Sequence, residues 1–146
     1  MSNWLIDKSA LARLGRSAEP DVWADRIERG RVRICVVTQL EVGYSARSLD
    51  DLRTLRGTPP LAALVTESIT PAVEERALQV QEELAARGHH RGPSLADILL
   101  AATAEIAHLT VLHLDKDFEL IASLTGQPVE RLRLASDGDG DTGRDR

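Results

Sequence analysis

The chain has 146 residues, a length that suits one compact domain with one hydrophobic core. It is 42% hydrophobic and 28% charged, which is typical of a globular protein, and no apolar run reaches the roughly 20 residues that span a bilayer. The net charge of -5 argues against a protein that binds nucleic acid by covering phosphates with positive charge. A site that binds divalent cations through carboxylates is compatible with this charge.

Two features of the sequence bear on the compartment. The first residues lack the basic start and the small-residue cleavage site of a signal peptide, so we expect a cytoplasmic protein with no membrane association. The single cysteine, Cys35, cannot form an internal disulfide and lies in the apolar run 34–37. We therefore predict a buried, inert thiol, which suits a reducing compartment.

The first half of the chain alternates between strand-like and helix-like patterns. Short apolar runs at residues 4–6 and 32–37 predict strands, each followed by a segment with helical spacing. Residues 49–64 resemble one or two short helices, interrupted by a glycine and two prolines at 57–60. A weaker strand candidate follows at 64–69.

The second half continues the alternation. Helical periodicity predicts helices over 71–87 and 94–108. Strands are predicted at 110–114 and, more weakly, at 129–134. Residues 136–146 contain no large apolar side chain, so we expect one domain over 1–135 and a disordered tail after it. The alternation indicates an α/β fold, an α/β/α sandwich with a central, mostly parallel sheet.

Four acidic residues occupy related places in this pattern. Asp7 follows the first predicted strand, and Asp115 follows the strand at 110–114. Glu41 and Asp97 lie near the predicted starts of helices. Because strand ends and the helix starts that follow them meet at one edge of a parallel sheet, we expect the four side chains to converge.

Each of these acids also has an ordinary structural explanation. Thr38 with Glu41, and Ser94 with Asp97, have the spacing of N-terminal capping boxes, and the other two acids could be caps or turn residues. Capping does not require all four to share an edge, however. Carboxylates placed close together are costly unless a cation compensates them, and Mg²⁺ or Mn²⁺ prefers oxygen ligands. The pattern therefore indicates a metal centre that could activate a water to attack a phosphodiester.

The sequence blocks around these acids resemble those of PIN domains in order and spacing, and the similarity extends to about Leu134. Within that superfamily the chain is most similar to VapC-type toxins of bacterial type II toxin-antitoxin pairs. The blocks that carry the resemblance are residues 5–10, 41–43, 94–102 and 114–118.

The resemblance implies a function and a set of partners. It implies a Mg²⁺-dependent endoribonuclease, with Mn²⁺ as a substitute, that hydrolyses RNA phosphodiester bonds by metal-activated water in a PIN-like nuclease domain. It also implies a homodimer that a cognate antitoxin inhibits by inserting a segment at or near the acidic pocket. Carried over by position, the catalytic and metal-binding residues are Asp7, Glu41, Asp97 and Asp115, with Asp117 as an additional or alternative metal ligand and Ser9 as an auxiliary polar residue.

Two other functions stay open from the residues. The first is a PIN-like binding module that retains the fold and its partners without cutting RNA. The second is a Mg²⁺-dependent aspartyl-phosphate phosphatase, which is disfavoured because such enzymes place a second acid two residues after the nucleophile, where this chain has Ser9. Metal titration would separate the first alternative from a nuclease.

Basic and imidazole side chains outside the acidic set are less informative. The four histidines do not form a zinc pattern, although His89 and His90 precede the helix of Asp97 and could contact RNA. Two groups of arginines stand out: Arg13 and Arg16 in the first helix, and the run Arg26, Arg29, Arg31 and Arg33. Such charges usually only keep a surface solvated, and contact with RNA or with an acidic antitoxin segment is the alternative.

Overall fold

Five parallel strands form one sheet in the order β3-β2-β1-β4-β5 in the computed structural model, which describes residues 2–135. The α/β class and the parallel sheet predicted from the alternation are confirmed. The predicted disordered tail, 136–146, lies outside the described residues. The strands are β1 (Trp4–Ile6), β2 (Val32–Cys35), β3 (Val65–Glu67), β4 (Thr110–His113) and β5 (Val129–Arg131).

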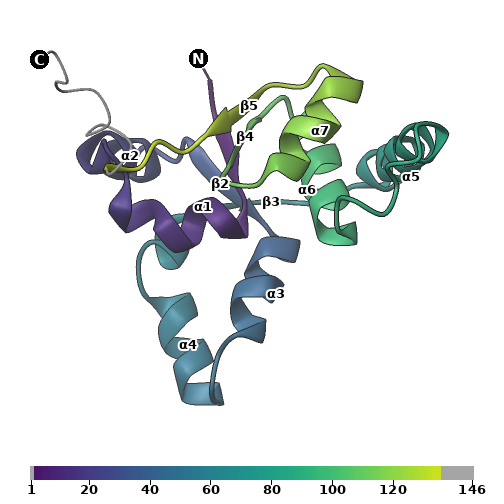
Figure 1. Ribbon diagram of the computed structural model, residues 1–146. Helices are drawn as coiled ribbons and strands as arrows, with labels where there is room; N and C mark the ends of the chain where they lie inside the picture. The colour runs from purple at the N-terminus through teal and green to yellow at the C-terminus, as the bar shows by residue number, and fades with distance from the viewer. Residues whose placement is uncertain (1, 136–146) are drawn as a thin grey trace, which may run out of the picture.

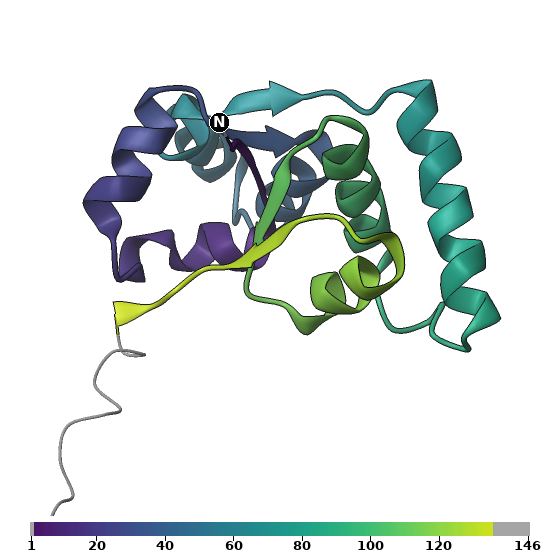
Figure 2. The same ribbon diagram turned by 90° about the horizontal axis from the view of Figure 1, so that it is seen from above.

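Helices cover both faces of this sheet. Figure 2 shows α1 and α2 on one side and α5, α6 and α7 on the other, so the domain has three layers. Within residues 2–135, no helix combines the length and the hydrophobicity needed to cross a membrane. The helices are α1 (Lys8–Arg13), α2 (Pro20–Glu28), α3 (Val36–Tyr44), α4 (Leu49–Gly57), α5 (Pro71–Ala86), α6 (Leu95–Ile106) and α7 (Lys116–Thr125), with short 3₁₀ turns η1 (Leu14–Arg16) and η2 (Leu61–Ala63).

The alternation of side chains along β1 explains why the sheet is buried on both faces. Leu5 packs with the core under α5, α6 and α7, whereas Trp4 and Ile6 pack with the core under α1 and α2. On the second face the rings of Trp4 and Trp23 meet edge to face at 5.2 Å between centroids. Hydrophobic burial on both sides thus holds β1 at the centre of the sheet.

Several strands are shorter than predicted. The run 32–37 was predicted as one strand, but β2 ends at Cys35, and Val36 with Val37 forms the first turn of α3. An apolar run does not distinguish a strand from a buried helical turn, since Val37 packs against the core as part of a helix too. The strands predicted at 64–69, 110–114 and 129–134 are likewise trimmed to β3, β4 and β5.

The predicted helices agree more closely with the structure. The helix expected at 71–87 is α5, which Thr70 caps and which ends before Gly88, a residue with φ of +73°. The helix expected at 94–108 is α6, capped by Ser94. The interrupted segment 49–64 forms α4 and η2. Local start and stop signals were therefore reliable guides to these elements.

The connectivity creates a crevice at the carboxyl edge of the sheet. The chain runs from β1 to β2 and β3 on one side, and then returns to place β4 on the other side of β1. Ligand sites of open α/β sheets lie where the strand order reverses in this way. Asp7 directly follows β1, and α7, which follows β4, begins after Asp115. In Figure 1, α3 and α4 project from this part of the molecule.

Truncating the central strand should cost much of the stability. Leu5 is fully buried, so Leu5→Ala should lower the free energy of unfolding by about 2–5 kcal/mol, measured by urea denaturation. Leu78→Ala is the matched control, because Leu78 is 66% exposed on α5 and its truncation should change stability by less than about 0.5 kcal/mol. Equal effects of the two substitutions would contradict this assignment of the core.

Candidate metal centre

A cleft of about 500 Å³ opens at the carboxyl edge of the sheet, and Asp7, Glu41, Asp97 and Asp115 all line it. The four acids come from separate elements: the end of β1, α3, the start of α6 and the end of β4. The structure therefore brings together the side chains that sequence reasoning expected to converge. The remaining lining residues belong to α1 and η1 and are Lys8, Ser9, Ala12, Arg13 and Arg16.

Asp7 is the most buried acid of the cleft, with 5% of its surface exposed. It caps α1 by accepting a hydrogen bond from the Ala10 amide at 2.9 Å, and the Ser9 hydroxyl donates to both carboxylate oxygens, at 2.7 and 2.8 Å. Burial nevertheless raises the pKa of Asp7 to about 6, and the charge of Asp97 adds to this effect. The carboxylate is held firmly in a place where its charge is costly.

Ser9 connects two strand ends through its hydroxyl group. While its proton is shared with Asp7, its oxygen accepts a hydrogen bond from the Leu114 amide at 2.9 Å, directly after β4. Ser9 does not cap α1, since Asp7 is the N-cap of that helix. Ser9 is a polar support that fixes Asp7 relative to β4.

Asp97 takes part in a capping box at the start of α6. Its Oδ2 accepts a hydrogen bond from the Ser94 amide at 3.2 Å, and the Ser94 hydroxyl accepts one from the Asp97 amide at 3.1 Å. The capping box predicted from the spacing is confirmed. Burial raises the pKa of Asp97, and the charges of Asp115 and Asp117 raise it further.

Asp115 and Asp117 lie in the first turn of α7 and beside Asp97. Asp115 is the N-cap, and its Oδ1 accepts a hydrogen bond from the Asp117 amide at 2.9 Å. Burial, followed by the charge of Asp115, raises the pKa of Asp117. Among residues 2–135, Asp97, Asp115 and Asp117 form a trio that offers one carboxylate oxygen each, all within 4.8 Å of one another.

Glu41 occupies a different place in its helix from the one predicted. Because α3 begins at Val36 with Cys35 as its N-cap, Glu41 lies in the second turn, and the capping box proposed for Thr38 and Glu41 is wrong. The Thr38 side chain is buried and lies 3.7 Å from the Cys35 sulfur. Burial and the charge of Asp97 raise the pKa of Glu41, whereas Lys8 lowers it. Helix capping therefore does not explain why an acid stands at position 41.

The electrostatics of the cleft centre on Asp97. Its charge raises the pKa of both Asp7 and Glu41, and it is itself affected by Asp115 and Asp117. Such a cluster resists full ionisation until a cation compensates it. Oxygen-only ligands suit hard divalent ions such as Mg²⁺, so the donor set present here fits a divalent metal.

His113 supports this site and was missed by sequence reasoning, which treated the histidines together. Its Nδ1 accepts a hydrogen bond from the Asp115 amide at 3.2 Å, and its buried ring lies 5.5 Å from that of Phe118. Burial lowers the pKa of His113, which favours the neutral ring needed to accept this bond. A signal was present in the sequence: His113 stands two residues before an acid that follows a strand.

The arginine run of residues 26–33 is used for local structure, which favours the interpretation that such charges only cover a surface. Arg26 lies over the Trp4 ring at 4.4 Å, and Arg33 donates to Glu67 at 2.6 Å. The other two members also have local partners, Arg29 with Asp25 and Arg31 with the Ser2 carbonyl.

The loop before α6 is the other predicted RNA contact. His89 and His90 are exposed there but do not line the acidic cleft. Their contact with RNA stays a prediction.

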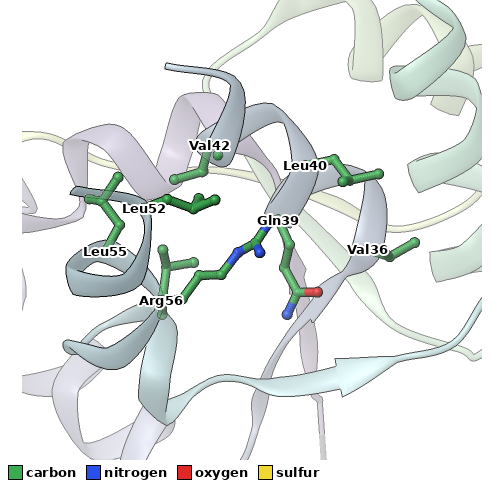
Figure 3. Close-up of a pocket in the computed structure, with 9 residues that line it drawn as sticks. Val36, Gln39, Leu40, Val42, Leu52, Leu55 and Arg56 are labelled. Carbon is green, nitrogen blue, oxygen red and sulfur yellow. The ribbon is translucent and has the colours of Figure 1, made fainter. Parts of the chain in front are cut away.

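A second, mostly apolar groove of about 340 Å³ lies between α3 and α4 (Figure 3). Leu40, on α3, is 60% exposed. A side chain at Gly43 would meet Leu52 at 3.1 Å and Arg56 at 3.2 Å, so glycine permits the close approach of the two helices. The lining residues are Val36, Gln39, Leu40, Val42, Gly43, Leu52, Leu55, Arg56 and Leu61.

Comparison with known proteins agrees with this geometry. The PIN domain family model matches residues 4–124. The chain is 59% identical to Ribonuclease VapC2 of Mycobacterium tuberculosis over 129 residues, which are 88% of this chain and 92% of that protein. The chain therefore belongs to the PIN-domain family and, within it, to the VapC ribonucleases.

Solved structures share the fold. A chain of the DNA-bound VapBC complex from Salmonella typhimurium aligns with a TM-score of 0.69 and 21% identity, covering 90% of this chain and 98% of that chain. A chain of VapBC-5 from Mycobacterium tuberculosis aligns with a TM-score of 0.61 and 26% identity, covering 92% and 100%. The second structure is described as a member of the VapBC family of toxin-antitoxin systems.

The raised pKa of Asp7 predicts a pH dependence of stability. The folded state binds the proton of the Asp7 carboxyl group more tightly than the unfolded chain does, since the pKa of this group is near 3.8 when it is exposed. The free energy of unfolding of the metal-free protein should therefore fall as the pH rises from about 4 to about 6 and change little above that. Asp7→Asn removes the charge and should raise stability at pH 8 by on the order of 2 kcal/mol.

Urea denaturation in EDTA between pH 4 and pH 8 measures this effect. Asp21→Asn, at an exposed position in the first turn of α2, is the control and should leave the pH dependence intact. A less stable Asp7→Asn protein at pH 8 would show that the charge of Asp7 is not costly.

Proposed function

We propose that this protein is a Mg²⁺-dependent endoribonuclease, the toxin of a toxin-antitoxin pair, that hydrolyses RNA phosphodiester bonds in the acidic cleft. The observation that carries the proposal is the convergence of four carboxylates from separate elements in one cleft, where the strand order reverses. The ribonuclease names of the most similar relatives support it.

The carboxylates have distinct places in this proposal. Asp97, Asp115 and Asp117 would hold the cation, since their oxygens lie closest together, and Asp7 and Glu41 would complete the acidic wall. Because Asp115 lines the cleft and Asp117 does not, Asp115 would be the main ligand of the two, with Asp117 as an additional one. A bound Mg²⁺, or Mn²⁺ in its place, supplies compensation of phosphate charge and lowers the pKa of an attacking water.

Two side chains hold these ligands in place. The Ser9 hydroxyl donates to both carboxylate oxygens of Asp7. His113 accepts a hydrogen bond from the Asp115 amide and so holds the turn in which the Asp115 carboxylate lies. Metal sites depend on such outer partners to orient their ligands. Both residues are therefore positioning residues in this proposal.

The alternative functions receive less support. An aspartyl-phosphate phosphatase needs a free nucleophilic carboxylate, but Asp7 is buried and the Ser9 hydroxyl bonds to both of its oxygens. A binding module without turnover has no need of the costly acidic set that the cleft retains. Measuring metal binding and RNA cleavage on the same protein tests the binding module.

The apolar groove between α3 and α4 is the surface that we assign to the antitoxin. Solved structures with this fold include a member of the VapBC family of toxin-antitoxin systems and a toxin-antitoxin complex from Klebsiella pneumoniae, which supports a partner of this kind. Leu40 lines the groove, and its neighbour Glu41 lines the acidic cleft. An antitoxin segment that leaves the groove would therefore be close to the metal site. The homodimer and the cytoplasmic location stay predictions of the sequence.

Removal of the Asp97 charge should strongly reduce catalysis. Asp97→Asn retains an oxygen that can accept the Ser94 amide but removes the central charge of the cleft. RNA cleavage with Mg²⁺ should fall by more than the about 10- to 100-fold typical of losing an outer partner of a metal ligand. Binding of Mn²⁺, measured by calorimetry, should weaken in parallel.

The control for this test is Asp50→Asn, an exposed acid in the first turn of α4, which should cleave RNA and bind Mn²⁺ normally. Full activity of Asp97→Asn would refute the assignment of the site. A wild-type protein that binds antitoxin but neither binds millimolar Mn²⁺ nor cuts RNA would be a binding module instead.

A charge in the apolar groove should weaken the antitoxin complex. Leu40→Asp should lower antitoxin affinity by about tenfold or more, because a carboxylate would have to lose its hydration in the complex. Val22→Asp, at an exposed apolar position on α2, should have no effect on the affinity. Unchanged binding by Leu40→Asp, or its conversion of a dimer to a monomer, would assign the groove to something other than the antitoxin.

A further inference from the structure

One wall of the acidic cleft is positively charged. Lys8, Arg13 and Arg16, which we call the cationic wall, all come from α1 and the η1 turn that follows it. Arg13 shares a face of α1 with Ser9 and Ala12, because the three residues follow the i, i+3, i+4 spacing of a helix, and Arg16 in η1 lines the same cleft. Ala12, which has a small side chain, also lines the cleft.

The two arginines of this wall do not pair with the acids that line the same cleft. Within residues 2–135, neither Arg13 nor Arg16 makes an ion pair or a side-chain hydrogen bond, although four carboxylates line the same cleft. By contrast, Arg33 pairs with Glu67. Lys8 lies close enough to Glu41 to lower its pKa, whereas Arg13 and Arg16 form a basic pole of the cleft whose charges are not paired with the acidic pole.

The two arginines of the cationic wall suit a ligand that carries several phosphates. Arg13 ends α1 and Arg16 ends the η1 turn that follows it, and both line the cleft beside the acids. The guanidinium group of arginine matches phosphate oxygens bidentately.

We propose that the cationic wall binds the phosphates of the RNA strand that flank the bond held at the acidic pole. This inference rests on the proposed ribonuclease function and deepens it, since it names how the substrate strand is oriented. RNA is favoured over an acidic peptide because its neighbouring phosphates are covalently attached to the one at the acids. A local wall also explains how a protein of net charge -5 binds a polyanion.

The test is the salt dependence of RNA binding. A fluorescein-labelled single-stranded RNA of mixed sequence is titrated with protein at several salt concentrations, in an Asp97→Asn background that suppresses cleavage. Each phosphate contact on a single strand contributes about 0.7 to the slope of log affinity against log salt. Arg13→Gln with Arg16→Gln should therefore lower the slope by about 1.4.

Two further variants separate local contact from other effects. Arg13→Lys with Arg16→Lys should restore the slope, because the charges remain, which a role in packing would not predict. Arg29→Gln with Arg53→Gln changes the net charge equally outside the cleft and should leave the slope unchanged. An unchanged slope for the Arg13/Arg16 glutamine variant, or an equal loss in this control, would overturn the proposal.

Cleavage without the Asp97 substitution separates failure of this inference from failure of the proposed function. Normal KM and salt slope with Arg13→Gln and Arg16→Gln, in an enzyme that does cut RNA, would overturn the cationic wall alone. Absence of Mg²⁺-dependent cleavage by the wild-type protein would overturn the ribonuclease. Loss of antitoxin affinity with RNA binding unchanged would assign the wall to an acidic segment of the antitoxin and refute the RNA contact.

Discussion

One hydroxyl group, that of Ser9, ties together the two strand ends around which the cleft is built. It donates to the Asp7 carboxylate after β1 and accepts from the Leu114 amide after β4. These are the neighbouring strands at which the chain reverses its order in the sheet. This short, partly buried connection, together with the hydrogen bond from the Asp7 amide to the Leu112 carbonyl, therefore fixes the position of Asp7 relative to the chain that leads into Asp115.

Capping and metal binding are compatible roles for the acids of this cleft. Asp7, Asp97 and Asp115 each cap or box the start of a helix, and the positive end of the helix dipole partly offsets the cost of bringing their charges together. The raised pKa values of Asp7 and Asp97 show that this compensation is incomplete. The remaining cost is what a divalent cation would remove, so local structure prepares the site for a metal.

The cleft also separates its charges by element. The acids come from the carboxyl edge of the sheet and from α3 and α6, whereas the unpaired arginines come from α1 and η1. The helix α3 lies between this cleft and the apolar groove, with Glu41 on one side and Leu40 on the other. Substrate, metal and protein partner can thus use adjacent surfaces of one small domain.

The sequence by itself determined the alternation of strands and helices, the parallel sheet and the meeting of Asp7, Asp97 and Asp115 at one edge, because periodicity and chain order suffice for these. Tertiary structure decided where α3 begins, since the apolar run at 32–37 suits a strand and a buried helical turn equally, and it thereby moved Glu41 away from a cap. It also decided which arginines are paired and which histidine supports Asp115. Arg33 and Glu67 are 34 residues apart and meet only because β2 and β3 pair in the folded chain, whereas the bond between the Asp115 amide and His113 depends on the turn that follows β4.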